Sequence, residues 1–207
     1  MLSETLWKLN HEIAEQCLAH PFIAGLGAGT LLQPAFKRYV AQDVFFLQAY
    51  LRAQALCVAK SKEMRYAQAF HGLMSGALHE LDVHAQHSKA LGIDLEKVVP
   101  YRETLAYTDF LMRTAWHEDV GKILAAMTPC MRLYAYLGAQ LSAQSHPEHP
   151  YRLWIETYSS QEFQQLAQTM ENLLDEHAAD SSEIRYAYNY AMRCELDFFG
   201  APMEETV

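Results

Sequence analysis

Hydrophobic residues recur every three or four positions through most of the chain, which is the spacing of amphipathic α-helices. Polar and glycine-rich segments interrupt this pattern at intervals and mark the connections between helices. We expect about eight helices, of which the pattern places one before His20-Pro21, others over about 34–60, 63–91, 101–116 and 119–144, and three more around Trp154, Phe163 and Glu195.

Residues with strong preferences for helix ends fix the expected boundaries. Gly92 suits the left-handed position just after a helix. Ser159 with Glu162 forms the pattern of a capping box, and Ser182 can cap the last helix. The glycine-rich run 24–30 is expected to be a turn between helices. It lacks the preceding strand and the Lys-Ser or Lys-Thr pair of a phosphate-binding loop.

The composition supports an all-α fold. Alanine and leucine, which favour helices, far outnumber valine and isoleucine, which favour strands. The 207 residues suffice for one sizeable hydrophobic core, and no repeat, low-complexity stretch or linker divides them. We therefore expect residues 1–207 to form a single helical domain.

Charge and cysteine usage narrow the classes of partner. The net charge of −9 and the pI near 5.5 argue against nucleic acid, because phosphate contacts need clustered lysine and arginine. The four cysteines show no CxxC spacing, so neither a disulfide framework nor a zinc ribbon is indicated. The sequence starts without a signal-like segment and has no apolar run of about 18 residues. We expect a soluble, cytoplasmic protein with no membrane partner.

Cys130 stands directly after Pro129 in the middle of a long helical pattern. At about 100° per residue, Cys130 shares its face with apolar residues, so its sulfur should point toward the core. Proline lacks the N–H that continues a helix, which makes this an unusual place for a thiol. A lone cysteine is more often a small core residue than a nucleophile, so a catalytic interpretation needs further residues.

Two carboxylates are also predicted to point inward. Asp43 lies at the centre of an apolar face of its helix, and Glu195 shares a face with Tyr188 and Phe199. Neither carboxylate has a lysine or arginine one turn away on its own stripe. A buried carboxylate is costly unless it finds a partner or its pKa shifts. Together with Cys130, these residues indicate a nucleophilic or acid–base site inside a helical bundle.

A second group of residues raises the possibility of a metal site. Glu80, His84 and His87 fall on one helical face. Their spacing, E-x-x-x-H-x-x-H, is neither HExxH nor the ExxH of di-iron bundles, and no matching set of ligands stands out on another helix. Exposed or hydrogen-bonded histidines are therefore the preferred interpretation, and no metal or cofactor is expected.

Several short segments, taken in order along the chain, form a more specific pattern. The most distinctive is the stretch from Trp154 to Phe163. The others are His20-Pro21-Phe22, Gln42-Asp43, the run 106–111, Pro129-Cys130 with Tyr134, His149-Pro150-Tyr151 and the run 194–199. The combination resembles the TenA family, also called thiaminase II, over essentially the whole chain. The resemblance implies a haem-oxygenase-like helical fold without haem, a homotetramer, and hydrolysis of aminopyrimidines or thiamin in thiamin salvage.

The resemblance also assigns roles to residues of this sequence. Cys130 matches the family nucleophile, Glu195 the acid/base, and Asp43 the carboxylate that grips the pyrimidine. Family members often carry a tyrosine after the Gln-Asp pair, whereas this chain has Val44-Phe45-Phe46, so Phe46 keeps a stacking surface and lacks the hydroxyl. The remaining matches surround the substrate with the hydroxyls of Tyr107, Tyr134 and Tyr158 and the ring of Phe198.

Two other functions fit the same inward residues. A non-catalytic protein that binds or senses a pyrimidine would keep the pocket and show no turnover. An oxidative enzyme on the same bundle, either cofactor-free or di-iron, is the other alternative, and iron content after purification would identify the di-iron form. Thiamin and its aminopyrimidine degradation product both remain open as the physiological substrate.

Overall fold

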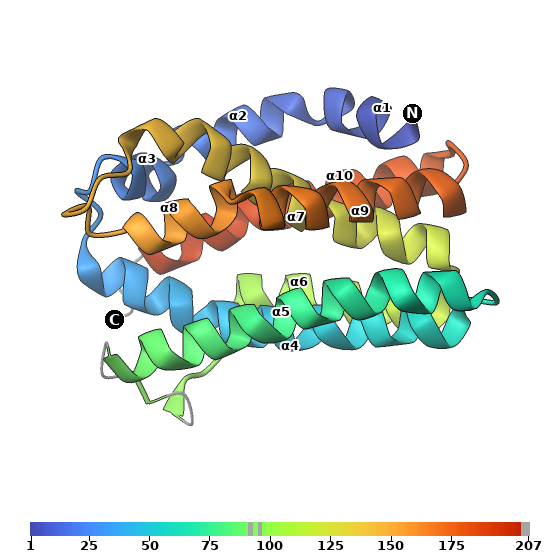
Figure 1. The fold of residues 1–207 in the computed structure, drawn as a ribbon, viewed down its shortest axis with the longest axis horizontal. Helices are drawn as coiled ribbons and strands as arrows, with labels where there is room; N and C mark the ends of the chain where they lie inside the picture. The colour runs from blue at the N-terminus through green and yellow to red at the C-terminus, as the bar shows by residue number, and fades with distance from the viewer. Residues whose placement is uncertain (91–92, 95–96, 204–207) are drawn as a thin grey trace.

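The computed structural model describes residues 1–90, 93–94 and 97–203, which form a bundle of helices (Figure 1). These residues contain no β-strand, so the all-α fold expected from the composition is confirmed. The helices are α1 (Leu2–Leu9), α2 (His11–Ala19), α3 (Pro21–Gly27), α4 (Gln33–Lys60), α5 (Met64–Ala90), α6 (Arg102–His117), α7 (Val120–Leu141), α8 (Arg152–Ser159), α9 (Gln161–His177) and α10 (Ser182–Gly200), with short 3₁₀ turns at Ser142–Gln144 and Ala201–Met203.

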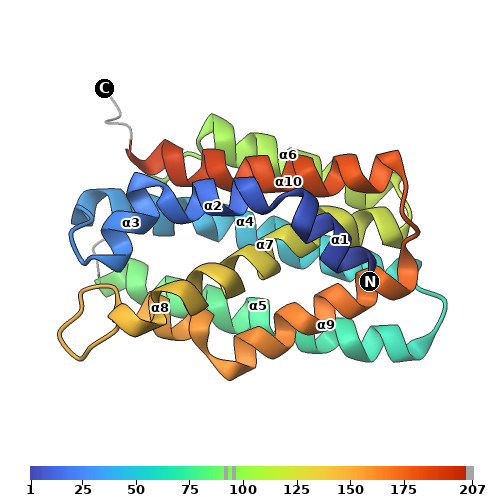
Figure 2. The same ribbon diagram turned by 90° about the horizontal axis from the view of Figure 1, so that it is seen from above.

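Helix α7 lies at the centre of the bundle. It packs against α4, α6, α8, α9 and α10, and its side chains are buried on most of its circumference. Figure 1 shows α4 and α5 running side by side along one side of the molecule. Seen from above, α7 crosses obliquely between α10 and the pair α8 and α9 (Figure 2). A residue on α7 can therefore contact residues from several helices at once.

The expected number of about eight helices is too low, because the described residues form ten. One reason is that the first predicted helix divides at Asn10 into α1 and α2. The buried Asn10 side chain donates to the carbonyl of Leu6 at 2.8 Å and accepts from the amide of Asn189 at 2.7 Å. A side chain that bonds to nearby backbone offers an alternative to a continuous helix.

The second reason is that the glycine-rich run 24–30, expected as a turn, is partly helical. Pro21 occupies the start of α3, and Nδ1 of His20 accepts from the N–H of Phe22 at 3.2 Å. The helix continues to Gly27. Gly29 follows with a φ of 71°, a left-handed value that favours glycine. Gly25 and Gly27 thus lie in the last turns of α3, and Gly29 lies in the turn that follows it.

Two predicted helix caps are wrong by one residue. The hydroxyl that caps α9 belongs to Ser160, which accepts a backbone N–H at 3.1 Å, and not to Ser159. Ser181, and not Ser182, caps α10 in the same way at 3.2 Å. Both sites hold adjacent serines, and the backbone angles decide which hydroxyl meets the free N–H groups. The predicted helix end at Gly92 lies outside the described residues.

Apolar side chains from every described helix meet in one core. Aromatic residues are prominent in it: the ring of Phe22 stacks on that of Phe199, with centroids 5.8 Å apart, and Tyr39 packs against both. Among the described helices, none is both long enough and apolar enough to cross a membrane.

Close packing of α7 against the junction of α8 and α9 gives a first prediction. A Cβ added at Gly138 would lie 2.6 Å from the backbone nitrogen of Ser159, and backbone cannot move aside as a flexible side chain can. We expect Gly138→Ala to lower the free energy of unfolding by about 1–3 kcal/mol, measured by urea denaturation.

Gly72→Ala on α5 is the matched control for this substitution. A Cβ at Gly72 would meet nothing within 4 Å. Because alanine favours helix over glycine, this control should leave stability unchanged or raise it by up to about 1 kcal/mol. Similar effects of the two substitutions would contradict the packing at Gly138.

Candidate active site

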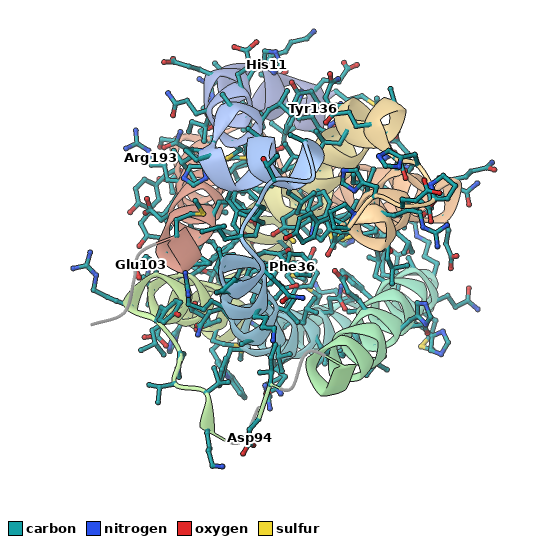
Figure 3. The ribbon with its side chains drawn as sticks, turned by 90° about the vertical axis from the view of Figure 1, so that its left-hand side faces the viewer. His11, Phe36, Asp94, Glu103, Tyr136 and Arg193 are labelled. Atoms are coloured by element: carbon teal, nitrogen blue, oxygen red, sulfur yellow. The ribbon has the colours of Figure 1, made fainter. Side chains whose placement is uncertain are left out.

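A cavity of about 360 Å³ lies between α4, α5, α7, α8 and α9. Its volume falls in the range of small-molecule sites. Phe36, labelled in Figure 3 and placed on the first turn of α4, lines one end. Aromatic side chains form much of the wall, namely Phe46, Tyr50, Tyr134, Trp154, Tyr158 and Phe163. A flat ring with a few polar groups would suit such a space.

Asp43 on α4 brings a carboxylate to this wall. The residue is 4% exposed and lines the cavity one turn before Phe46. The inward orientation predicted from the helical pattern is therefore confirmed. The negative charge of Asp43 acts on its neighbours, since it raises the pKa of Glu195 and of Cys130. Asp43 thus belongs to the same electrostatic group as the thiol.

Glu195 on α10 is the most deeply buried carboxyl of the site, at 1% exposed. The hydroxyl of Tyr107 on α6 donates to its Oε1 at 2.7 Å, and the neighbouring thiol of Cys130 also lowers the pKa of the carboxyl. Burial nevertheless raises the pKa of Glu195 to about 8, because these two interactions do not offset the loss of hydration. The carboxyl can therefore gain or lose a proton near neutral pH.

Cys130 on α7 connects Glu195 with the cavity. Cys130 lines the cavity, and its side chain is therefore only half-buried. Protein surrounds the residue on its other sides. Burial raises the pKa of the thiol well above its usual range, and the charges of Glu195, Glu80 and Asp43 raise it further. A thiolate therefore requires a proton acceptor, and the Glu195 carboxyl, whose pKa is coupled to that of the thiol, is the candidate.

A set of tyrosine hydroxyls surrounds this group. The hydroxyl of Tyr39 donates to that of Tyr134 at 3.1 Å, and the indole nitrogen of Trp154 donates to Tyr39 at 3.3 Å. The hydroxyl of Tyr158 donates to Oε1 of Glu80. Burial raises the pKa of Tyr134 and Tyr158 well above the usual value. Both hydroxyls therefore stay protonated at physiological pH.

The eight residues expected at the site occupy two places. Five of them line the cavity: Asp43, Phe46, Cys130, Tyr134 and Tyr158. The structure places Glu195, Tyr107 and Phe198 outside the lining, directly behind it. Tyr107 holds the Glu195 carboxyl, and the ring of Phe198 packs 6.0 Å from that of Phe46. Substrate contact by Tyr107 and Phe198 stays a prediction.

Sequence reasoning missed several polar residues of the lining, among them Tyr50, Gln54 and Glu80. Tyr50 and Gln54 continue the Asp43 face of α4 at positions 7 and 11 residues on, so helical spacing could have identified them. Glu80 on α5 was considered only as a metal ligand, and its partner Tyr158 comes from a distant helix. The side chains of His84 and His87 lie outside the described residues. In the remainder, no group of three or more potential ligands is arranged to hold a metal ion.

The fold and the site together define an all-α bundle protein with a buried thiol–carboxyl pair beside an aromatic cavity. Comparison with protein families is consistent with this class: the TENA/THI-4/PQQC family matches residues 7–205. The chain belongs to this family, and the resemblance seen in its sequence is confirmed.

Individual relatives agree with the family. The chain is 33% identical over 180 residues to an aminopyrimidine aminohydrolase from Halalkalibacterium halodurans, covering 84% of this chain and 80% of the relative. It is 34% identical over 224 residues to the mitochondrial bifunctional TH2 protein of Arabidopsis thaliana, covering 95% of this chain and only 36% of that longer protein. The crystal structure of a TenA family transcription regulator from Silicibacter superposes with a TM-score of 0.90 at 27% identity, covering 98% of this chain and 96% of the other.

The buried state of Glu195 predicts a specific dependence of stability on pH. The pKa of Glu195 is about 8 in the folded protein against an ordinary 4.5, so the folded state holds the proton more tightly. The resulting stability is fully present below pH 4.5 and is lost as the pH rises through about 8. Glu195→Gln removes this titration. We expect the free energy of unfolding of Glu195→Gln, minus that of the native protein, to increase by several kcal/mol as the pH rises from 4.5 to about 8. Each unit by which the pKa is raised corresponds to roughly 1.4 kcal/mol.

Urea denaturation of both proteins from pH 5 to pH 9 measures the effect. Other titrating groups are common to the two proteins and cancel in the difference. Parallel stability curves would contradict a raised pKa at Glu195.

Proposed function

We propose that this protein hydrolyses 4-amino-5-aminomethyl-2-methylpyrimidine, and thiamin, to 4-amino-5-hydroxymethyl-2-methylpyrimidine in thiamin salvage. The observation that carries the proposal is the pair of Cys130, which lines an aromatic cavity, and the buried Glu195, whose pKa values are coupled. Relatives named aminopyrimidine aminohydrolase support the reaction class. Side chains alone perform the proposed steps.

The difficulty of the reaction is that water does not readily displace an amine from the exocyclic methylene. Glu195 in its carboxylate form accepts the proton of the Cys130 thiol, and the thiolate adds to the ring carbon next to the substituted one. Electrons from the ring then form a double bond to the methylene as the carbon–nitrogen bond breaks. Glu195 gives its proton to the departing amine.

The second half of the reaction reverses the first with water in place of the amine. Water adds to the exocyclic methylene while Glu195 accepts the proton that it releases. The ring recovers its double bond as the carbon–sulfur bond breaks, and the thiolate regains a proton from Glu195. The raised pKa of Glu195 suits both directions of this transfer, because an acid–base group works best near the ambient pH.

The residues that line the cavity bind the pyrimidine in the proposed reaction. Asp43 hydrogen-bonds a ring nitrogen or the 4-amino group and so stabilises the electron-rich adduct. Phe46 offers a stacking face, and the hydroxyls of Tyr134 and Tyr158 offer hydrogen bonds to the ring substituents. Tyr107 acts on Glu195, whose carboxylate it stabilises by its hydrogen bond.

A non-catalytic pyrimidine-binding function is the alternative, and the Silicibacter relative described as a transcription regulator is the observation that favours it. Binding alone, however, needs no thiol that can pass its proton to a buried carboxyl. The family resemblance leads us to expect one domain, assembly as a homotetramer and location in the cytoplasm.

Cys130→Ala tests the nucleophile. A thiol that faces a cavity can shrink to a methyl group at modest packing cost, whereas nucleophilic catalysis disappears. We expect the rate of aminopyrimidine hydrolysis to fall by roughly 10³-fold or more while the melting temperature changes little. Cys57→Ala is the matched control, because Cys57 is buried on α4 away from the cavity lining. Near-normal turnover by folded Cys130→Ala protein would rule out the covalent route.

Glu195→Gln tests the acid–base role by comparing two leaving groups. The substitution keeps the shape of the side chain and cannot cycle a proton, so hydrolysis of the aminomethylpyrimidine should fall by roughly 10²- to 10⁴-fold with binding largely kept. The loss should be smaller on thiamin, because its thiazolium departs without needing a proton. Equal losses on both substrates, measured as kcat, would show that Glu195 does not mainly protonate the leaving group.

A further inference from the structure

Gln54 on α4 has a buried side-chain oxygen without a partner among the described residues. The residue is 1% exposed and lines the cavity. Its Oε1 is shielded from solvent and accepts no hydrogen bond from any described residue. Most buried polar side-chain atoms are hydrogen-bonded, and leaving one unsatisfied is costly. The missing partner of this amide is therefore expected from outside the chain, and the adjoining cavity is the route by which it arrives.

The position of Gln54 relative to Asp43 is fixed by helix geometry. The two residues are 11 positions apart, which places them within about 20° on one face of α4 and about 16 Å apart along its axis. Phe46, Leu47 and Tyr50 line the cavity between them. The cavity therefore extends well beyond the space that one pyrimidine ring fills when it is held at Asp43.

The thiol lies between these two ends. The hydroxyl of Tyr50 donates to the carbonyl of Met127 at 3.1 Å, and the hydroxyl of Tyr39 donates to Tyr134 at 3.1 Å. Helices α4 and α7 are thus antiparallel at this point, and Cys130, between positions 127 and 134, faces α4 between positions 39 and 50. The order along the cavity is Asp43, the thiol, Tyr50 and Gln54.

When Asp43 holds a ring nitrogen, the chemistry of the substrate indicates which part reaches Gln54. In the pyrimidine, the carbon that bears the exocyclic methylene is across the ring from the carbon between the two nitrogens. A ring held by a nitrogen at Asp43 with its reacting carbons at Cys130 therefore directs its leaving group past the thiol toward Tyr50 and Gln54. Ammonia ends close to the ring, whereas a larger leaving group continues along the cavity.

We propose that the Gln54 end of the cavity is a leaving-group subsite, which takes 5-methylenepyrimidines with an extended leaving group and hydrogen-bonds a hydroxyl or amide of that group through the Gln54 side chain. This inference rests on the proposed hydrolysis and deepens it. The described lining residues include the carboxylates of Asp43 and Glu80 and contain neither lysine nor arginine. The subsite therefore accepts neutral or cationic leaving groups, such as the hydroxyethyl thiazolium of thiamin, in preference to phosphorylated ones.

Gln54→Leu tests the subsite with the two substrates. Leucine has a similar volume and makes no hydrogen bond, so kcat/KM for thiamin should fall about three- to tenfold, the worth of one neutral hydrogen bond, mostly through KM. For the aminomethylpyrimidine, kcat/KM of Gln54→Leu should stay within about twofold of the native value. The melting temperature should stay equal or rise, because the amide oxygen accepts no hydrogen bond from the described residues. Gln48→Leu, on the exposed face of the same helix, is the matched control and should change neither substrate.

The other possible outcomes contradict either the subsite alone or the proposed hydrolysis as well. Equal losses on both substrates, or no loss on thiamin, would overturn the subsite while leaving the proposed hydrolysis intact. Native protein that hydrolyses the aminomethylpyrimidine and not thiamin would do the same. Native protein that hydrolyses neither compound would overturn the proposed function, and the subsite with it.

Discussion

The electrostatic coupling between the thiol of Cys130 and the buried carboxyl of Glu195 is the interaction on which the site depends. Loss of hydration destabilises the charged form of each group, so neither ionises at its ordinary pH. Together the two groups can hold one proton and move it over a short distance. The bundle makes this possible by packing α6, α7 and α10 so closely that water is kept from the carboxyl.

In the proposed reaction, this arrangement separates two tasks in space. The proposed proton transfer takes place behind the cavity wall, where Tyr107 donates a hydrogen bond of 2.7 Å to Glu195. The proposed substrate recognition takes place in front of it, where Asp43 and aromatic residues line the cavity. Cys130 belongs to both regions, because it lines the cavity and its pKa is raised by the buried Glu195 carboxyl.

The sequence predicted features that depend on one helix, and it failed where several helices meet. Helical spacing placed Asp43, Cys130 and Glu195 inward because each position is set by its own helix. It could not divide the first helix at Asn10, since the partner amide of Asn189 comes from the other end of the chain. It also considered Glu80 only as a possible metal ligand and set that possibility aside, because the contact with Tyr158 appears only when α5 and α8 are brought together. The same limit applies to Tyr107, whose place behind the cavity wall depends on the packing of α6 against α10.

The most direct test of the central claim is the pKa of Glu195 itself. Carbon-13 NMR of protein labelled at the glutamate side-chain carboxyls, compared with the spectrum of Glu195→Gln, identifies the Glu195 signal by its absence in the variant. We predict that this signal titrates with a pKa near 8 in the unliganded protein, far from the ordinary 4.5. A signal that titrates near 4.5 would show a hydrated, ionised carboxylate at neutral pH and would contradict the account of the Cys130–Glu195 pair.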